Sequence, residues 1–568
     1  MTNFVITKEK TTTDNTYNKF ESFDLNNYTL LIEGNYLFFQ NKTGQKIIII
    51  GDCINSHIIN CESFYSKDLI LKLKGIFIAF IVEENKFLII PSLFGFFPVY
   101  YSTDYKTISN SIEQIKNIEG KVVSLNKRFV LESYLFNYSF SNQTYLNGIY
   151  RLNSFSLISY HERISIERYS DLTDFFINNP TSGKNEIENL GSLFLTNIKE
   201  YFSESGNSIT FTSGFDGRTI LSSAIYHSVR FDTFSLGREE NDDVAIPLRN
   251  SKDLNIPYHF YDLGCKQYAE RYYLCAQKMS KITGGFNGFL YGHFLYGAER
   301  EKEVNDILHT GYCGSELFRA LHIQGAVTSK ELVSIFTVED DLNLKDILWN
   351  SPKLAFIKKL EYRNEFEDIF TEILEFRKTK NNYISINHFF YSYVFTEVFR
   401  KVFGAWTLAQ MQEMIVRTPF LDYDFVTALM KTDLAGCNND FFTHNPLKRL
   451  KGQQLYAEII RQTNTKLYNM KTGRGYRPLD LLSIQGHARI LFPYFKKQFK
   501  KQSIRPNLDN LGIISAYQYH KNEIDSLYKN LEGFEIARLL ESSSKLNSYT
   551  SEEERDILLQ TASLASIL

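Results

Sequence analysis

The chain has 568 residues, of which 43% are hydrophobic and 23% are charged, and its formal net charge is −2. This length exceeds one ordinary core, so we expect two or more domains of globular composition. The balanced charge argues against a nucleic-acid partner, and no apolar run reaches the roughly 18 residues that a membrane-spanning helix needs. The start of the chain lacks a secretory signal pattern. The six cysteines form no CxxC pair, which suits a reduced cytoplasm and argues against a zinc site.

The first 170 residues show short alternating strand patterns. Tyr28–Ile32, Gly75–Ile81 and Phe87–Ile90 are examples, and turn signals such as Glu33-Gly34-Asn35 separate them. This predicts a sheet-rich domain over residues 1–170. A polar stretch at Asn178–Lys184 then predicts a linker over residues 171–187.

The rest of the chain, residues 188–568, reads as a second domain. Strand patterns such as Phe231–Leu236 and Asp306–Thr310 alternate with helical ones, which is typical of a parallel α/β sheet. After about residue 320 the periodicity is helical through to the C-terminus.

One stretch in this second part, Ser208–Arg218, predicts an anion site. Ile209 and Phe211 indicate a short strand, small residues follow, and a helix pattern begins at once. Backbone N–H groups converge at such a helix N-terminus, and Gly214 and Gly217 allow a ligand to come close. The Lys-[Ser/Thr] ending of a Walker A loop is missing. The same pattern also occurs in ordinary strand–turn–helix junctions, where glycine serves only the geometry.

Several motifs in order resemble the asparagine synthetase-like family. Thr212–Gly217 is similar to the Ser-Gly-Gly-x-Asp-Ser pyrophosphate loop of ATP pyrophosphatases. Four later stretches resemble further family motifs, and two earlier ones resemble the glutamine amidotransferase domain of asparagine synthetases. These stretches are Phe234–Gly237, Thr310–Phe318, Val416–Asp422 and Met470–Pro478, and before them Leu73–Phe80 and Phe94–Tyr101.

The resemblance implies the fold and the ligands. It implies an α+β N-terminal-nucleophile-like sandwich, followed by an α/β adenine-nucleotide α-hydrolase-like (ATP pyrophosphatase) domain with a helical C-terminal part. It implies ATP and Mg²⁺, with the metal on Asp216. The residues implied to bind the nucleotide are Thr212, Ser213, Gly214, Asp216, Gly217, Arg218, Ser235 and Gly311.

Lys471 has a clear physical role beside this loop. A cation aimed at the leaving pyrophosphate and at the tetrahedral intermediate stabilises the transition state more than the ground state. Arg218 and Arg474 are candidates to assist it. The basic run Lys496, Lys497, Lys500, Lys501 and Arg505 favours a solvated helix face, with a docking patch as the alternative.

The chain departs from the family pattern at informative positions. The family's glutaminase nucleophile is a cysteine exposed by removal of the initiator Met, and position 2 here is Thr2, so we expect no glutaminase activity. The family's metal-binding Asp is Ser315, which leaves the magnesium to Asp216, the phosphates and water. The family's Glu after Gly311 is Tyr312.

Tyr312 has a counterpart in β-lactam synthetases, which resemble this scaffold. There a Tyr pairs with a Glu to deprotonate a substrate amine. We expect Glu397 to be the carboxylate partner, with Glu413 as the alternative, although Tyr312 could also simply pack at the strand end.

The resemblance therefore implies a ligase that forms C–N bonds. It adenylates a carboxylate and couples it to an amine, intramolecularly as in lasso-peptide macrolactam cyclases or β-lactam synthetases. The implied substrate is a small molecule or peptide that carries both groups, and the implied partners are a leader-peptide-binding protein or a protease. The alternatives are an asparagine synthetase that uses free ammonia and a non-catalytic nucleotide-binding scaffold.

Overall fold

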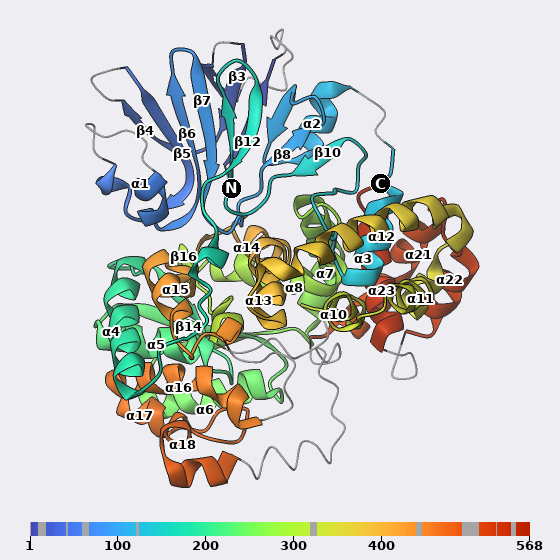
Figure 1. Ribbon diagram of the computed structural model, residues 1–568. Helices are drawn as coiled ribbons and strands as arrows, with labels where there is room; N and C mark the ends of the chain where they lie inside the picture. Colours follow the sequence, from blue (N-terminus) through green and yellow to red (C-terminus); the bar gives the residue numbers. More distant parts are fainter. Residues whose placement is uncertain are drawn as a thin grey trace.

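The computed structural model is a mixed α/β protein that contains, in the residues it describes, three β-sheets and many helices (Figure 1). The described residues are 2–8, 19–25, 27–40, 44–59, 67–120, 124–318, 327–438, 446–490, 511–529, 531–546 and 552–568. The basic run from Lys496 to Arg505 lies outside them. Across these ranges, no helix is both long and apolar enough to cross a bilayer. The expected order of a strand-rich first part and a helix-rich second part is confirmed.

Two antiparallel six-stranded sheets make up the first part, at the top of Figure 1. The ring centroids of Phe4 and Phe80 lie 5.0 Å apart across the space between them. One sheet has the order β10(Ile149–Arg151), β8(Tyr100–Ser102), β9(Thr107–Ser109), β1(Asn3–Thr7), β3(Thr29–Glu33), β2(Glu21–Asp24). The other has the order β12(Ile164–Arg168), β11(Ser156–Tyr160), β7(Lys86–Pro91), β6(Gly75–Glu83), β5(Lys46–Cys53), β4(Tyr36–Gln40).

The run Ile47–Ile50 shows why this part folds as a sandwich. Successive side chains of a strand point to opposite faces of the sheet. Ile48 and Ile50 accordingly join the core shared by the two sheets, whereas Ile47 and Ile49 join a second cluster on the outer face. That outer cluster includes Ile70 of the short helix α1(Lys67–Lys72). The second sheet is therefore covered on both faces, which explains four consecutive isoleucines in one strand.

The third sheet is parallel and positions the candidate site. Its order is β15(Tyr258–Asp262), β14(Phe231–Gly237), β13(Asn207–Thr210), β16(Ile307–His309), β17(Ile415–Arg417). The chain runs outward from β13 to β15 and then returns to place β16 on the other side of β13. Ligands of open α/β sheets bind at the carboxyl ends of the strands where the order reverses in this way. The connections include α5(Asp216–Tyr226), α6(Asp242–Leu254), α7(Lys266–Ile282) and α8(Gly288–Glu301).

Helices fill most of the remaining described chain. The segment η7(Val394–Phe403) is a π-helix that continues into α14(Gly404–Gln410). The other α-helices are α2(Ile112–Glu119), α3(Lys127–Phe136), α4(Lys184–Tyr201), α9(Gly314–Phe318), α10(Lys330–Thr337), α11(Asp341–Trp349), α12(Arg363–Lys378), α13(Ile386–Tyr393), α15(Tyr423–Met430), α16(Pro446–Thr463), α17(Thr465–Asn469), α18(Pro478–Leu482), α20(Ile513–Tyr519), α21(Lys521–Lys529), α22(Ile536–Ser544) and α23(Glu552–Ala565).

The predicted linker, residues 171–187, is more ordered than a free connector. The N–H of Thr181 donates to the carbonyl of Lys431 at 3.0 Å, and its own carbonyl accepts from Asp433 at 2.9 Å. Helix α4 begins at Lys184, within the predicted linker. These two hydrogen bonds fix the segment against the loop that follows α15. The polar residues of the sequence predicted a turn here, but they could not predict which part of the chain it packs against.

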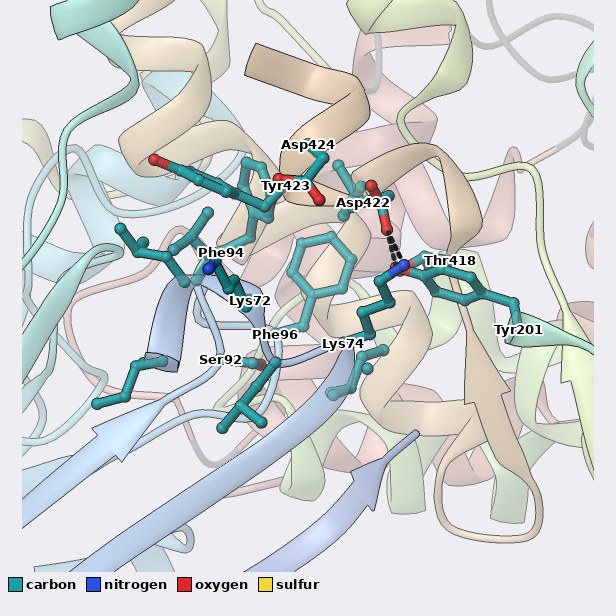
Figure 2. A pocket seen from close by; sticks show the side chains of 17 residues that line it. Lys72, Lys74, Ser92, Phe94, Phe96, Tyr201, Thr418, Asp422, Tyr423 and Asp424 are labelled. Carbon is teal, nitrogen blue, oxygen red and sulfur yellow. Dashed lines mark hydrogen bonds and ion pairs between the residues drawn. The ribbon is translucent and has the colours of Figure 1, made fainter. Parts of the chain in front are cut away.

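Charged contacts join the first two sheets to the third. The Nε and Nη2 of Arg417 on β17 donate to the carboxylate of Asp52 on β5 at 2.8 and 3.2 Å. Close by, Lys74 lies 3.2 Å from the carboxylate of Asp422 (Figure 2). Arg417 and Asp422 both belong to the Val416–Asp422 motif, so this motif attaches the sandwich to the edge of the parallel sheet.

We predict that Arg417→Met lowers the free energy of unfolding by about 2–3 kcal/mol, because it leaves Asp52 unpaired in a site where its side chain is only 17% exposed. Denaturant unfolding followed by circular dichroism measures this. The matched control is Arg300→Met, which breaks the more exposed pair with Glu303 and should cost at most about 1 kcal/mol. Equal costs for the two variants would contradict a joining role for Arg417.

Candidate functional site

The loop after β13 meets the end of β16 at a distance that only glycine permits. A Cβ atom on Gly217 would lie 2.1 Å from the carbonyl oxygen of Thr210, and one on Gly311 would lie 2.4 Å from the Cβ of Asp216. Gly214 differs, because its nearest non-neighbouring atom would be Thr212 Oγ1 at 3.5 Å. Gly217 and Gly311 thus bring α5 against the carboxyl ends of both central strands.

The N-terminus of α5 presents free backbone donors. Its N-cap residue, Phe215, provides no side-chain hydrogen bond to the first turn. The first N–H groups of a helix have no intrahelical partner, and with the helix dipole they favour an anion. Asp216 and Gly217 of this turn line an open cleft, and concave sites of this kind are where small-molecule ligands bind.

The cleft brings together six of the residues that the sequence predicted for the site. They are Thr212, Asp216, Gly217, Ser235, Gly311 and Tyr312. Ser213, Gly214, Arg218, Lys471 and Glu397 do not line it. Of these, Ser213, Gly214 and Arg218 belong to the same loop and helix, and Lys471 lies in a loop packed against them.

The carboxylate of Asp216 is held by two hydroxyl groups. Ser315 donates to its Oδ2 at 2.9 Å, and Tyr456 donates to its Oδ1. Ser315 therefore faces Asp216 directly, at the position where the resemblance places a second metal-binding Asp. Within the described ranges there is no cluster of three or more His, Cys, Asp or Glu residues suited to a metal. The donors fit a magnesium ion only if phosphates and water complete its shell.

Other predicted residues have their hydroxyl groups engaged by the protein. The backbone N and Oγ of Ser213 both donate to Asp243 of α6, at 3.1 and 2.6 Å. Ser235 donates to the carbonyl of Phe211, and Thr212 Oγ1 accepts from the N–H of Gly214 at 3.4 Å. These side chains fix the conformation of the loop. The groups left to contact a ligand are therefore the main-chain N–H groups of the loop and the carboxylate of Asp216.

Arg218 is a buried cation directly behind the loop. Its side chain is fully buried, and desolvation lowers its pKa to about 10. Its Nη2 donates to the carbonyl of Lys471 at 3.3 Å, whereas Nε and Nη1 have no hydrogen-bond partner in the part of the chain that the structure describes. The guanidinium also lies 6.0 Å from the ring centroid of Phe211. A cation this poorly compensated favours an anion nearby.

The loop that carries Lys471 packs onto the loop that follows β13, residues 211–215. The N–H of Gly473 donates to the carbonyl of Ser213 at 3.0 Å, and Arg218 holds the carbonyl of Lys471. Lys471 itself is exposed, and its amine makes no hydrogen bond or ion pair with any residue that the structure describes. The backbone thus brings Lys471 to the predicted loop and leaves its charge uncompensated.

The expected pairing of Tyr312 with Glu397 is wrong. The Tyr312 hydroxyl donates to Oε1 of Gln410, the last residue of α14, at 3.1 Å. Burial raises the pKa of Tyr312 well above its ordinary value. The alternative partner is also wrong, because Glu413 forms an ion pair with Lys278 at 2.8 Å.

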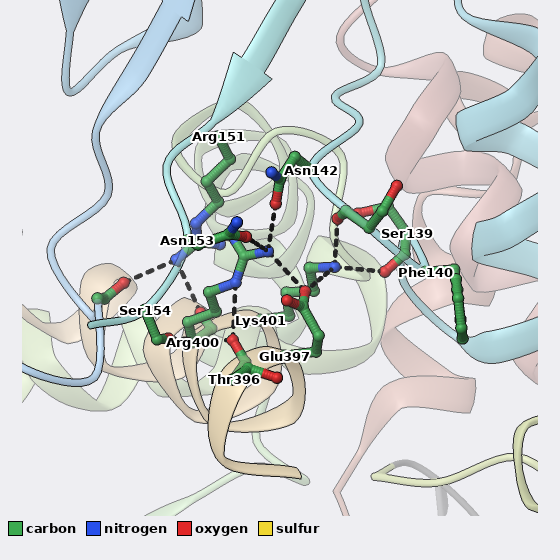
Figure 3. A network of polar contacts seen from close by, with 12 residues as sticks. Ser139, Phe140, Asn142, Arg151, Asn153, Ser154, Thr396, Glu397, Arg400 and Lys401 are labelled. Carbon is green, nitrogen blue, oxygen red and sulfur yellow. Dashed lines mark hydrogen bonds and ion pairs between the residues drawn. The ribbon is translucent and has the colours of Figure 1, made fainter. Parts of the chain in front are cut away.

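Glu397 instead belongs to a polar network under the first sheets (Figure 3). Its Oε2 lies 2.5 Å from Arg400 and 2.6 Å from Lys401. Arg400 also donates to the carbonyl of Leu152 and to the side chain of Asn142, each at 2.9 Å. The two cations on the following helical turn hold the carboxylate of Glu397. Glu397 also lies 13 residues before Gln410, the partner of Tyr312, which corresponds to roughly 20 Å along a helix axis.

Sequence reasoning missed four residues of the site. Asp243 and Tyr456 hold the loop, Gln410 accepts from Tyr312, and His293 of α8 lines the cleft. The polar run Asn241–Asp243 at the start of α6 could have indicated the first of these. Tyr456, Gln410 and His293 are single polar residues within helical patterns, so only the tertiary structure shows that they lie at the site.

A comparison of the chain with protein-family models and with curated proteins finds no match to either.

We predict that Gly217→Ala lowers the free energy of unfolding by about 1–3 kcal/mol, because the new methyl group would collide with the Thr210 carbonyl. Gly214→Ala is the matched control, and it should change that free energy by less than about 0.5 kcal/mol. Denaturant titrations of both variants measure the difference. A similar loss in both would show that the loop, and not this one contact, is sensitive to substitution.

Proposed function

We propose that this chain is an ATP-dependent, AMP-forming amide synthetase of the asparagine synthetase-like kind. The observation that carries the proposal is the meeting of the uncapped N-terminus of α5 with the loop of Lys471, at the point where the strand order of the parallel sheet reverses. The same proposal interprets the parallel sheet as an ATP pyrophosphatase-like domain and the sandwich as an N-terminal-nucleophile-like domain. The facing antiparallel sheets and the order of the parallel strands support that interpretation.

The chemistry proposed follows from the positions of the charges. A carboxylate oxygen of the substrate attacks the α-phosphorus of ATP, and the bond to the β-phosphate oxygen breaks, so pyrophosphate leaves. The N-terminus of α5, Arg218 and Lys471 are the groups that stabilise this leaving charge. Magnesium bound with the phosphates would rest on Asp216 and water and supply further positive charge. An amine then displaces AMP and forms the amide bond.

A nucleotide-binding scaffold without turnover is the second candidate. It is favoured by the hydrogen bond from Ser315 to Asp216, since a hydroxyl group replaces the second carboxylate that a metal would use. The uncompensated Lys471 favours the enzyme, because a cation at the leaving group matters to turnover. Binding of ATP without pyrophosphate release on any tested carboxylate would select the scaffold.

We predict that Lys471→Ala lowers the kcat for pyrophosphate release by at least about a hundredfold, because it removes the exposed cation carried by the loop packed against the N-terminus of α5. The assay uses Mg-ATP with aspartate plus ammonium, and separately with synthetic peptides that each carry a free α-amine and one internal carboxylate. Unfolding stability should not change, because Lys471 is exposed.

The matched control is Lys466→Ala, which removes an exposed lysine from the neighbouring helix α17. It should leave pyrophosphate release within about twofold of the unmodified protein. Near-normal turnover in Lys471→Ala would place the catalytic cation elsewhere, and Arg474→Ala would be the next variant to measure.

We also predict that glutamine is not hydrolysed. Burial raises the pKa of the Cys53 thiol to about 12, so it stays protonated and unreactive at neutral pH. The Thr2 hydroxyl donates to the carbonyl of Asn35 at 2.8 Å. Glutamate release is measured beside pyrophosphate release on the same sample. A rate of glutamate release similar to the rate of pyrophosphate release would contradict this prediction. The variants Thr2→Ala and Cys53→Ala would then identify the nucleophile.

A further inference from the structure

One wall of the cleft is formed by one face of α8. His293, Phe294, Gly297 and Ala298 all line the cleft, as residues one helical turn apart do. Gly297 and Ala298 lie beside Leu236 at the end of β14, whereas His293 and Phe294 lie one turn earlier. Three aromatic side chains are in contact along this wall. The ring centroids of His293 and Phe294 lie 4.4 Å apart, and those of Phe294 and Tyr312 lie 6.1 Å apart.

His293 is buried and not fully hydrogen-bonded. Its side chain is only 5% exposed, and its Nδ1 has no hydrogen-bond partner among the described residues. Burial lowers the pKa of His293 to about 4, although the Leu290 carbonyl one turn earlier opposes the shift. The imidazole is therefore uncharged at neutral pH and able to accept a proton.

The other titratable side chains that line the cleft are already engaged. Asp216 accepts from Ser315 and Tyr456, and Asp243 accepts from Ser213. The Tyr312 hydroxyl donates its hydrogen to Gln410, and burial raises the pKa of Tyr312, so this hydroxyl stays protonated. An amide oxygen cannot take up the proton as a carboxylate would, so the Tyr312–Gln410 pair does not form a base.

We propose that His293 is the general base that takes the proton from the attacking amine. This inference rests on the proposed amide synthetase function. In the step, the amine nitrogen attacks the carbonyl carbon of the acyl-adenylate, and the C–N bond forms. The C–O bond to AMP breaks, AMP leaves with the electron pair, and the amine proton moves to the ring of His293.

The phosphates themselves would turn this weak base into an effective one. A negative charge within a few ångströms favours the protonated form of a histidine and raises its pKa. Before ATP binds, the buried imidazole is neutral and weakly basic. The acyl-adenylate carries its phosphate next to the carbonyl carbon that the amine attacks, so this negative charge would stabilise the imidazolium that proton transfer creates there. The base is then strengthened when the amine needs it.

The test separates adenylation from amide formation. Hydroxylamine is largely unprotonated at neutral pH and attacks acyl-adenylates without help from a base, so hydroxamate formation reports adenylation alone. We expect His293→Gln to form hydroxamate within about threefold of the unmodified protein and to form amide at least about a hundredfold more slowly. The probes are Mg-ATP with aspartate plus ammonium, and with synthetic peptides that carry a free α-amine and one internal carboxylate.

His309→Gln is the matched control. His309 on β16 is also fully buried, and burial lowers its pKa to about 3, but its Nε2 is hydrogen-bonded to Asn207 and it does not line the cleft. Its ratio of amide to hydroxamate should equal that of the unmodified protein, whatever the variant costs in stability. Added imidazole should restore amide formation in His293→Ala, because it can take the place of the missing ring as a base.

Three results would overturn the role of His293. Equal loss of hydroxamate and amide in His293→Gln would assign the residue to nucleotide binding. Normal amide formation in that variant would show that the base lies elsewhere. A shift of the ratio in His309→Gln would mean that the effect is structural. If the unmodified protein forms neither pyrophosphate nor hydroxamate, the amide synthetase function itself fails, and that result is distinguishable from the other three.

Discussion

The close approach of α5 to the ends of β13 and β16 is the constraint on which the site depends. Two glycines allow it, one in the first turn of the helix and one two residues after the end of β16. The approach does two things at once. It brings the free N–H groups of the helix to the point where the strand order reverses, and it places the carboxylate of Asp216 between Ser315 and Tyr456. A side chain at either glycine would push the first turn of α5, with Asp216, away from the ends of the two strands.

The second loop extends this arrangement by contacts between main-chain atoms. The segment around Lys471 is attached through the carbonyl of Lys471 and the N–H of Gly473. Neither contact uses the lysine amine, so the backbone can be fixed while the charged end stays able to move. Arg218 beneath the loop is fixed and fully buried. Two nitrogen atoms of this guanidinium have no hydrogen-bond partner among the described residues, which is costly for a buried cation, and an anion bound near the loop would offset that cost.

The sequence predicted the local parts of this site well and its long-range pairs poorly. The strand, the turn and the helix from Ser208 onward depend on neighbouring residues, so periodicity and glycine placement were sufficient. The partner of Tyr312 depends on how a π-helix and α14 are rotated against the parallel sheet, which no local pattern fixes. Glu397 seemed suitable by residue type alone. Arg400 and Lys401 on the next turn already neutralise it, and that pair was visible at (i, i+3) and (i, i+4) spacing.

His293 shows a different limit of sequence reasoning. A single histidine in a helix rich in aromatic residues is more often packed in a core than part of a site, and this one is indeed buried. Its position becomes informative only when the cleft is seen as two unlike walls. One wall carries the N-terminus of α5 with the carboxylates of Asp216 and Asp243, and the cations Arg218 and Lys471 lie outside the lining, in the helix and in the loop packed against it. The other carries uncharged polar groups among aromatic rings. A ligand that is anionic at one end and must lose a proton at the other would match both walls, because each wall stabilises the charge that the reaction creates beside it.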